Sequence, residues 1–358
     1  MRSSGQVRSC PRRATAFSIQ SNHLQDLGSI DMQVHGNWTG PWLTRCIVWA
    51  AVGWTVISLA NGAVAEDSSQ VRMETKEDRV SVFFGDELFT EYIFQGYEKP
   101  ILYPVIGPHG IRMTRDYPMK RGTPHEAEDH PHHKSIWFGH MDVNGESFWH
   151  MGKDAGRTES VEVRTEGNAI FARNRLVGHD GRLVAMDSRE IRFSQAPGAR
   201  FIDYFVTYHA TESDLVFGDN KDGQMGIRMH PRLRIKGPIA AGHAINANGV
   251  REDSIWGKRA PWIDYWADFD GRTVGIAMFD HPKNLRHPTW WHARDYGLLS
   301  ANPFGIHHFE NKPDPHLGDY VLLKGESLTF KHRFVFHEGD YAQANIDALY
   351  RAWAEQTP

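Results

Sequence analysis

The chain has little cysteine, no second long apolar run and no basic excess, and each absence narrows its class. Its 358 residues include two cysteines, Cys10 and Cys46, and both fall in an N-terminal segment with the plan of a secretory signal. The rest of the chain therefore has neither disulfides nor thiol chemistry. After residue 65 no apolar run is long enough to cross a bilayer, which takes about 20 residues. No membrane partner is expected once the signal is removed.

Residues 1–65 are predicted to be an N-terminal extension and signal peptide. Residues 46–65 contain no charged side chain, Arg45 precedes them, and Ala63-Val64-Ala65 has the small-x-small form of a cleavage site. Met32 is the expected true start, because the polar residues before it are atypically long for the beginning of a signal. The protein is thus expected to be exported, to the periplasm or outside the cell. A membrane anchor is the alternative, since this segment is long enough to span a bilayer.

Charge after residue 65 is acidic. Residues 1–65 hold five of the chain's 40 Lys and Arg and two of its 44 Asp and Glu. The remainder therefore has 35 basic and 42 acidic residues, a formal charge of −7. This balance does not favour nucleic acid or an anionic lipid surface as a partner. It favours a neutral or cationic substrate, either a small molecule or a glycan.

Short β-forming runs separated by turn residues fill residues 66–358, which are predicted to form a single domain. Helical periodicity is confined to residues 341–355, so parallel strands would lack the helices that connect them. The predicted fold is all-β, a large antiparallel β-sandwich with a C-terminal helix. The strand candidates are 79–84, 87–94, 100–106, 110–114, 160–165, 169–177, 183–194, 200–210, 226–235, 273–279, 321–323 and 327–337.

Histidine is abundant, with 21 in the chain, and it is densest in residues 129–149, DHPHHKSIWFGHMDVNGESFW. Imidazoles titrate near neutral pH and bind metals, so this stretch is predicted to form one wall of a site. A single histidine more often packs or caps a loop, but an apolar core gains little from so many. Asn144-Gly145 is a hairpin-type turn. The polar candidates here are His130, His132, His133, His140, Asp142 and Asn144.

A second polar group lies in residues 277–309. His292 and Arg294 are two residues apart, so a strand would direct both side chains to one face. Trp290 and Trp291 supply flat apolar surface on which sugar rings stack, although one of the two is expected to pack in the core. The further candidates in this group are Asp280, His281 and Asn284.

A third, thinner group combines residues 222–230 with residues 256–262. Arg228 and His230 share a strand face by the same alternation, and Asp222 precedes them. Lys258-Arg259, next to Trp262, would either clamp an anion or remain a solvated basic pair.

Four motifs of the chain carry a resemblance: TRDYPM, DHPHHKSIWFGHMDVNGESFW, WGKRAPW and DHPKNLRHPTWWHARDYGLLSANPFG. Together they resemble an exported bacterial family of unknown function whose members are labelled "methane oxygenase PmoA-like". The similarity covers about residues 71–337 and implies no established activity. The methane monooxygenase subunit of that name is an integral membrane protein, whereas this chain has no bilayer-spanning run after residue 65. Methane oxidation is therefore excluded and the label is misleading.

The predicted fold also resembles aldose mutarotases and some polysaccharide lyases, which place histidine, arginine and carboxylates on a concave sheet face. The resemblance implies a carbohydrate-active enzyme of epimerase, lyase or hydrolase type that uses histidine acid–base chemistry. The catalytic candidates are His132 or His140, His292, Asp222 and Arg294. The substrate-binding candidates are Trp262, Trp290, Asn144, Asn284, Arg228 and His230.

Two alternatives to this hypothesis remain open. One is a metalloenzyme, because His140-x-Asp142 with a distant histidine matches the two-His, one-carboxylate iron site, and His130-x-His132 with His140 would suit zinc. The metal candidates are then His130, His140, Asp142 and His281, with iron or zinc as a possible cofactor. The other alternative is a glycan-binding module without catalysis, which needs the tryptophans but no proton-transfer group.

Overall fold

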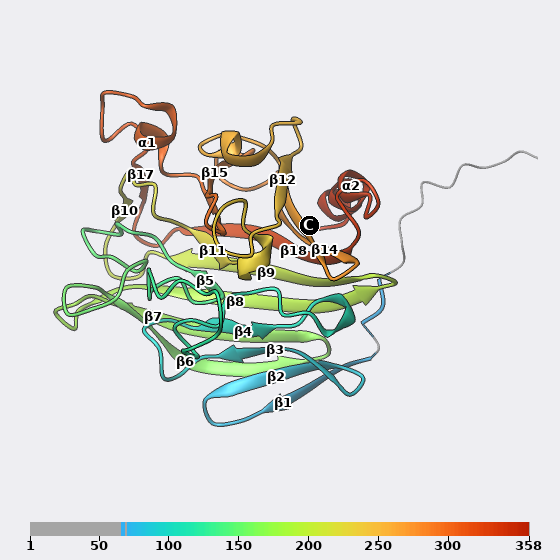
Figure 1. Cartoon of the computed structure of the whole chain (residues 1–358). Coiled ribbons are helices and arrows are strands. Elements are labelled where there is room, and N and C mark those ends of the chain that lie inside the picture. The colour runs from blue at the N-terminus through green and yellow to red at the C-terminus, as the bar shows by residue number, and fades with distance from the viewer. Residues whose placement is uncertain (1–65, 69, 358) are drawn as a thin grey trace, which may run out of the picture. The chain divides into compact units, whose positions relative to one another are not determined.

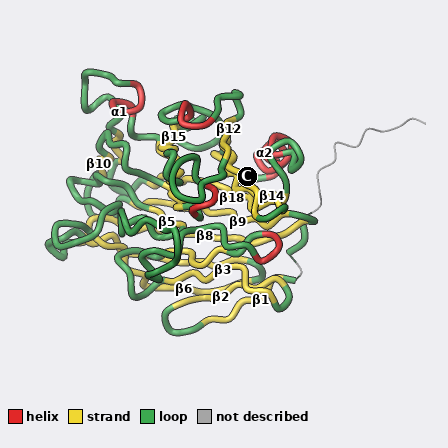
Figure 2. Tube along the Cα trace, viewed as in Figure 1, coloured by secondary structure: helices red, strands yellow, loops and turns green. Residues whose placement is uncertain are grey.

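Antiparallel strands dominate the structure, and helices are short (Figures 1 and 2). The computed structural model describes residues 66–68 and 70–357, so the predicted signal peptide at 1–65 lies outside the described residues. Within the described chain, strands pair in two eight-stranded antiparallel sheets and one two-stranded sheet. The predicted all-β antiparallel sandwich is confirmed. No helix of the described residues has the length and apolar character needed to cross a membrane.

The first sheet has the strand order β1-β2-β3-β4-β5-β11-β16-β15. Its first four strands follow one another in sequence, whereas its other half brings together three separate parts of the chain. The strands are β1 (Val71–Thr75), β2 (Arg79–Phe84), β3 (Glu87–Ile93), β4 (Ile101–Val105), β5 (Ile136–Phe138), β11 (Met225–Arg228), β16 (Leu298–Asn302) and β15 (Trp290–Ala293).

The second sheet has the order β12-β13-β14-β18-β9-β8-β7-β6 and contains the longest strands. A small two-stranded sheet pairs β10 (Leu215–Phe217) with β17 (Tyr320–Leu322). The strands of the second sheet are β12 (His243–Asn246), β13 (Trp262–Phe269), β14 (Arg272–Asp280), β18 (Ser327–Glu338), β9 (Ala199–His209), β8 (Leu183–Ala196), β7 (Ala169–Val177) and β6 (Arg157–Glu166).

Two predicted strands are wrong in extent. The strand expected over 226–235 ends at Arg228, because Pro231 cannot donate to a ladder and begins a 3₁₀ turn. The stretch expected over 110–114 makes isolated bridges only. The short helices are η1 (Pro108–Gly110), η2 (Pro231–Leu233), η3 (Glu252–Ile255) and α1 (Ile306–Glu310).

The predicted C-terminal helix is present as α2 (Ile346–Gln356), and it covers the outer face of the second sheet (Figure 1). Ile346, Tyr350 and Trp353 repeat at helical spacing and pack on that face, whose side chains include Phe201, Trp262, Phe279 and Val335. Residues 341–345, which were expected to be helical, form turns before Asn345, whose φ is 51°.

The core between the two sheets is built by side-chain alternation. Ile136 and Phe138 of β5 and Ile227 of β11 point inward, where they meet apolar side chains of the second sheet such as Tyr204 and Tyr208. Every second residue of the same strands therefore points to the outer face of the first sheet. A shift of one residue in register would exchange the two sets, so burial of the inner set fixes the position of the outer set.

One ion pair is enclosed in this core. Asp187 and Arg189 of β8 form a two-pronged contact, with Arg189 Nη2 2.9 Å from Asp187 Oδ2, and both side chains are buried. Arg189 also donates to the hydroxyl of Tyr204 at 3.0 Å, and Asn174 donates to Asp187. Removing either residue would leave the other as an uncompensated buried charge, which strongly lowers stability.

We expect Asp187→Asn to lower the free energy of unfolding by about 3–5 kcal/mol, because the buried Arg189 would lose its counter-charge. Urea denaturation followed by circular dichroism measures this loss. Asp154→Asn, at a side chain that is 81% exposed, is the matched control and should change stability by less than about 0.5 kcal/mol. Equal effects of the two substitutions would contradict the expectation.

Candidate functional site

The outer face of the first sheet gathers ionisable side chains from segments far apart in sequence. On β5 and β11 the outward residues are Trp137, Gly226 and Arg228, while their neighbours enter the core. On β15 and β16 His292 pairs with Ser300, and the adjacent Trp291 and Leu299 enter the core. The alternation thus selects His292 and Arg228 for this face.

An aromatic floor supports these groups. Trp137 and Trp149 are fully buried, with ring centroids 4.9 Å apart. Gly226 leaves room for Trp137, since a Cβ at residue 226 would lie 2.8 Å from the indole. The half-buried side chains packed on this floor are Tyr97, Tyr103, Met119, Met141 and Tyr296.

His130, His132, His133 and His150 pack ring against ring beside the floor. His133 stacks on Trp137 at 5.2 Å, and His132 meets the edges of His133 at 4.4 Å and His150 at 4.6 Å. Burial, followed by the charges of His150 and Lys99, lowers the pKa of His132 to about 3. The ring of His132 is therefore neutral at physiological pH.

His292 and Asp222 form the polar centre of the face. His292 Nδ1 donates to the carbonyl oxygen of Lys221 at 3.0 Å and lies 3.7 Å from Asp222 Oδ1. This contact fixes the tautomer, which leaves the lone pair on Nε2. Burial lowers the pKa of His292 to about 4, although the charge of Asp222 works in the opposite direction. The charge of Asp222 also raises the pKa values of His132 and His150. His292 and the ring-packed histidines therefore lie in the electrostatic field of the same carboxylate.

Two buried arginines share one carboxylate oxygen at the edge of the cluster. Arg115 Nη1 lies 2.6 Å and Arg228 Nη2 2.9 Å from Asp129 Oδ1, and Asp129 is 41% exposed. Arg228 also donates to His133 Nδ1 at 3.1 Å and lies over the ring of Tyr296. Burial lowers the pKa of Arg228 to about 10 and also lowers that of Arg115.

Lys99 is buried next to the histidines without a carboxylate contact. Its Nζ donates to the carbonyl oxygens of Trp149 and His150. Burial, followed by the charge of Lys134, lowers its pKa to about 7. The side chain is therefore close to half protonated at neutral pH.

His140, predicted as a catalytic or metal-binding residue, lies outside this cluster. It is fully buried, its Nε2 is 2.8 Å from the carbonyl oxygen of Gly218, and its ring packs on Phe304. Gly223 approaches His140 Nδ1 so closely that no Cβ would fit there. Asp142 accepts from the backbone of Gly145 at 2.8 Å, so its role is to close the predicted turn.

Two predicted substrate-binding residues, Asn144 and His230, instead form hydrogen bonds that hold loops in place. Asn144 adopts a positive φ of 54°, and its side chain bonds to the backbone of Asp214 at 2.9 Å and of Val216 at 2.6 Å. His230 precedes η2, where its Nδ1 accepts from the backbone of Arg232 at 3.1 Å. Both polar side chains are engaged by the chain itself.

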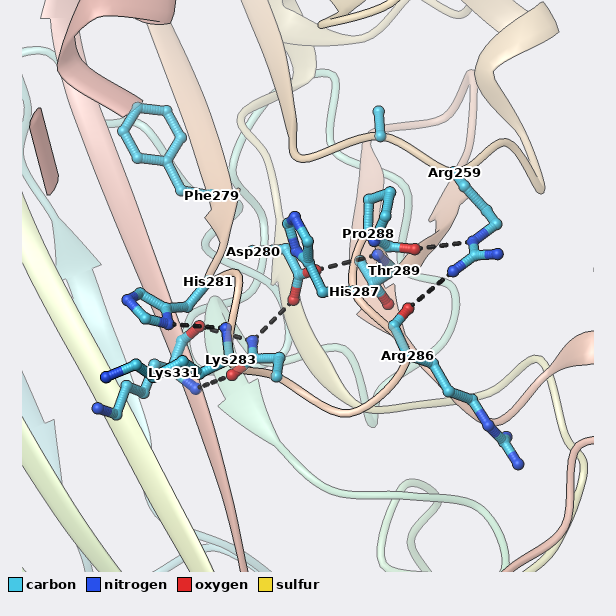
Figure 3. Close-up of polar contacts among 12 residues, drawn as sticks. Arg259, Phe279, Asp280, His281, Lys283, Arg286, His287, Pro288, Thr289 and Lys331 are labelled. Carbon is cyan, nitrogen blue, oxygen red and sulfur yellow. Dashed lines mark hydrogen bonds and ion pairs between the residues drawn. The ribbon is translucent and has the colours of Figure 1, made fainter. Parts of the chain in front are cut away.

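The loop after β14 is organised around Asp280 rather than around a ligand (Figure 3). Asp280 accepts from His287 at 2.7 Å, from the backbone of Thr289 at 3.0 Å and from Asn284 at 2.7 Å. Asn284 bonds to both backbone groups of Lys331 at 2.8 Å. His281 is buried between the backbones of Lys283 and Thr357. The structure thus places Asn284, predicted as a substrate ligand, and His281, predicted as a metal ligand, in contacts with the chain itself.

The tryptophans predicted to stack on sugar are buried elsewhere. Trp262 packs under α2, with its Nε1 3.3 Å from Asp347 Oδ1. Trp290 bonds to Glu310 at 3.1 Å, and the guanidinium of Arg259 lies 4.3 Å above its ring. Each is 4% exposed and is already in contact with other parts of the chain.

The predicted iron or zinc ligands are not brought together. His130 lies in the histidine group and contacts Asp129, whereas His140, Asp142 and His281 take up the separate structural roles given above. Among the described residues, no group of three or more His, Cys, Asp and Glu side chains has the arrangement of a metal site.

Several members of the cluster were not among the residues predicted from the sequence. Lys99 and Arg115 are single cations that the sequence does not pair with another site residue. Tyr296 lies in the turn between β15 and β16, where strand alternation gives no direction for a side chain. His150 directly follows the histidine-rich stretch 129–149 and could have been found by extending that stretch by one residue. The missed residues are Lys99, Arg115, His150 and Tyr296.

The structure defines an antiparallel β-sandwich with an ionisable cluster on one outer sheet face. The chain belongs to a family of unknown function, DUF6807, whose model matches residues 79–351. The prediction of a family without an assigned activity is confirmed. Among proteins with curated functions, none matches this sequence.

Solved structures with a similar course of the chain include sugar-related proteins. A galactose mutarotase-like protein from Lactobacillus casei aligns at 9% identity over 75% of this chain and 100% of its own, with a TM-score of 0.32. One from Clostridium acetobutylicum aligns at 7% identity over 75% and 98%, with a TM-score of 0.34. A GH36 α-galactosidase from Geobacillus stearothermophilus aligns at 11% over 79% and 42%, also with a TM-score of 0.34. Similarity this low supports no conclusion about activity.

We expect Lys99 to make stability rise with pH. In the unfolded chain Lys99 stays protonated to about pH 10.5, but in the folded protein it releases its proton near pH 7. Between these values the unfolded state binds more protons, so raising the pH favours folding. From pH 7 to 9 the wild type should gain about 2 kcal/mol relative to Lys99→Met.

Urea denaturation at both pH values measures this difference. Lys120→Met is the matched control, since Lys120 is 61% exposed and should contribute no such slope. Parallel pH profiles for the wild type and Lys99→Met would contradict the assignment.

Proposed function

We propose that the protein is an exported carbohydrate-active enzyme that transfers a proton on a sugar, with His292 as the base. The observation that carries this proposal is the contact of His292 with Lys221 and Asp222. The carbonyl of Lys221 holds the proton on Nδ1, and Asp222 lies 3.7 Å away, where it stabilises the imidazolium that forms when Nε2 accepts a proton.

His132 and the neighbouring cations complete the proposed machinery. His132 is a neutral ring under the field of the same carboxylate, so it is a second group able to exchange a proton or bond to a sugar hydroxyl. Lys221, 3.1 Å from Asp222, and Arg294, which interacts electrostatically with His292, provide positive charge for a developing oxyanion.

The aromatic floor supports a sugar as the proposed substrate. Tyr97, Tyr103 and Tyr296 are half-buried against the cluster that contains Trp137 and Trp149, so each combines apolar ring surface with a polar edge. Tyrosines of this kind suit the mixed apolar and hydroxyl surface of a sugar ring. They take the role that had been predicted for Trp262 and Trp290.

A time course of proton NMR spectra on a panel of monosaccharides and oligosaccharides tests the proposal, because anomer exchange, epimerisation and bond cleavage are all visible in one measurement. We expect the wild type to accelerate one of these reactions and His292→Gln to lose about 100-fold or more in rate. His316→Gln, at a histidine that is 77% exposed, is the matched control and should keep full activity.

Full activity of His292→Gln would contradict the assigned base. Sugar binding that resists this substitution, without turnover on any member of the panel, would instead indicate a glycan-binding protein.

The acid limb of kcat/KM should lie near pH 4. Because the pKa of His292 is lowered to about 4, the ring stays in its basic form as the pH falls through 6 and 5. Activity should therefore remain level down to about pH 5 and fall below it. Asp222→Asn removes a charge that raises the pKa of His292, so its limb should shift to lower pH. A limb near the ordinary histidine value of about 6.5 would contradict the assignment.

A further inference from the structure

Positive charge exceeds negative charge in the cluster on the outer face. Among the described residues that form it, three carboxylates, Glu98, Asp129 and Asp222, each pair with at least one cation. Five cationic side chains face these three, beside Lys99, which is close to half protonated: Arg115, Lys134, Lys221, Arg228 and Arg294. Adding the neighbouring Arg234 and Glu126 leaves the excess unchanged. The whole chain, in contrast, has a formal charge of −4.

Arg294 is the cation with free donors. It is half-buried and lies 5.6 Å over the ring of Tyr296, but no hydrogen bond or ion pair joins its guanidinium to any described residue. It follows His292 by two residues, directly after the end of β15, and its charge lowers the pKa of His292. A guanidinium offers two parallel N–H groups to a planar carboxylate and binds sulfate oxygens in a similar way.

The buried arginines are short of negative charge. Arg115 and Arg228 are each 2% exposed, and their only carboxylate contact among the described residues is the same Oδ1 of Asp129. Arg115 Nε is buried without a partner. Taking guanidinium groups out of water is costly unless their charge is compensated, so a further anion above this face would be stabilised by both.

We propose that the substrate is an acidic sugar, whose ring carries a carboxylate or sulfate ester that binds Arg294 beside His292. The proposal rests on the proposed function, since it names the substrate class of that site. It also departs from the neutral or cationic substrate expected from net charge. That expectation averages over the whole surface, whereas a ligand a few ångströms from Arg294 responds to the local charge.

Isothermal titration calorimetry with matched sugar pairs tests the proposal. The pairs are glucuronate with glucose, galacturonate with galactose, mannuronate with mannose, and galactose 6-sulfate with galactose, each also as short oligosaccharides where the acidic polymer supplies them. We expect the acidic member of at least one pair to bind about tenfold or more tightly than its neutral partner. The uronate and sulfate arms show which anion is recognised.

Substitution of Arg294 separates its role from a general effect of charge. Arg294→Gln should remove most of the preference for the acidic sugar, and Arg294→Lys should keep part of it, because the charge remains without the planar fork. Arg164→Gln is the matched control, since Arg164 also lies over an aromatic ring, that of Phe171, but on β6 of the second sheet. It should bind as the wild type does.

The failures can be told apart. Neutral sugars that bind as well as the acidic ones, or an acidic preference that survives Arg294→Gln, would overturn the inference and leave the proposed sugar enzyme standing. An absence of binding by both members of every pair would count against the proposed function itself, and the inference would fall with it.

Discussion

Side-chain alternation along β5, β11, β15 and β16 is the constraint on which this structure depends. These strands are short, and each sends one set of residues into the core and the other set to the outer face. Burial of Ile136, Phe138 and Ile227 fixes the register, and the same register places Trp137 and Arg228 outside. The free energy gained in the core therefore holds the polar cluster in place, although polar groups gain little by packing together.

The cluster combines groups that are individually unfavourable to bury. Neutral histidines, a lysine close to half protonation and two arginines on one carboxylate all have pKa values lowered by removal from water. Such departures gather where ionisable groups are arranged for chemistry or for a ligand. The ion pair Asp187–Arg189 on the other side of the first sheet is different, because each charge there is fully paired inside the protein.

Much of the fold could be predicted from the sequence, because turns and period-two alternation are local signals. The strands at 79–84 and 169–177 have the predicted limits. The site was harder, since a polar residue type does not reveal whether the chain itself satisfies it. His292 and Asp222 lie 3.7 Å apart, but His140 and Asn284 are used by backbone groups that only the folded chain brings near. The sequence also does not show whether a tryptophan packs in the core or faces a ligand, because an indole ring can do either.

The helix α2 makes the two outer faces of the sandwich different. In principle both outer sheet faces of such a fold are open to ligands, and either can acquire a site. Here Tyr350 and Trp353 occupy the outer face over β14 and β18 with apolar contacts, so that face is committed to stability. The opposite outer face keeps its ionisable side chains. A substitution under the helix should therefore act first on stability, whereas one on the opposite face can change the charge of the cluster without opening the core.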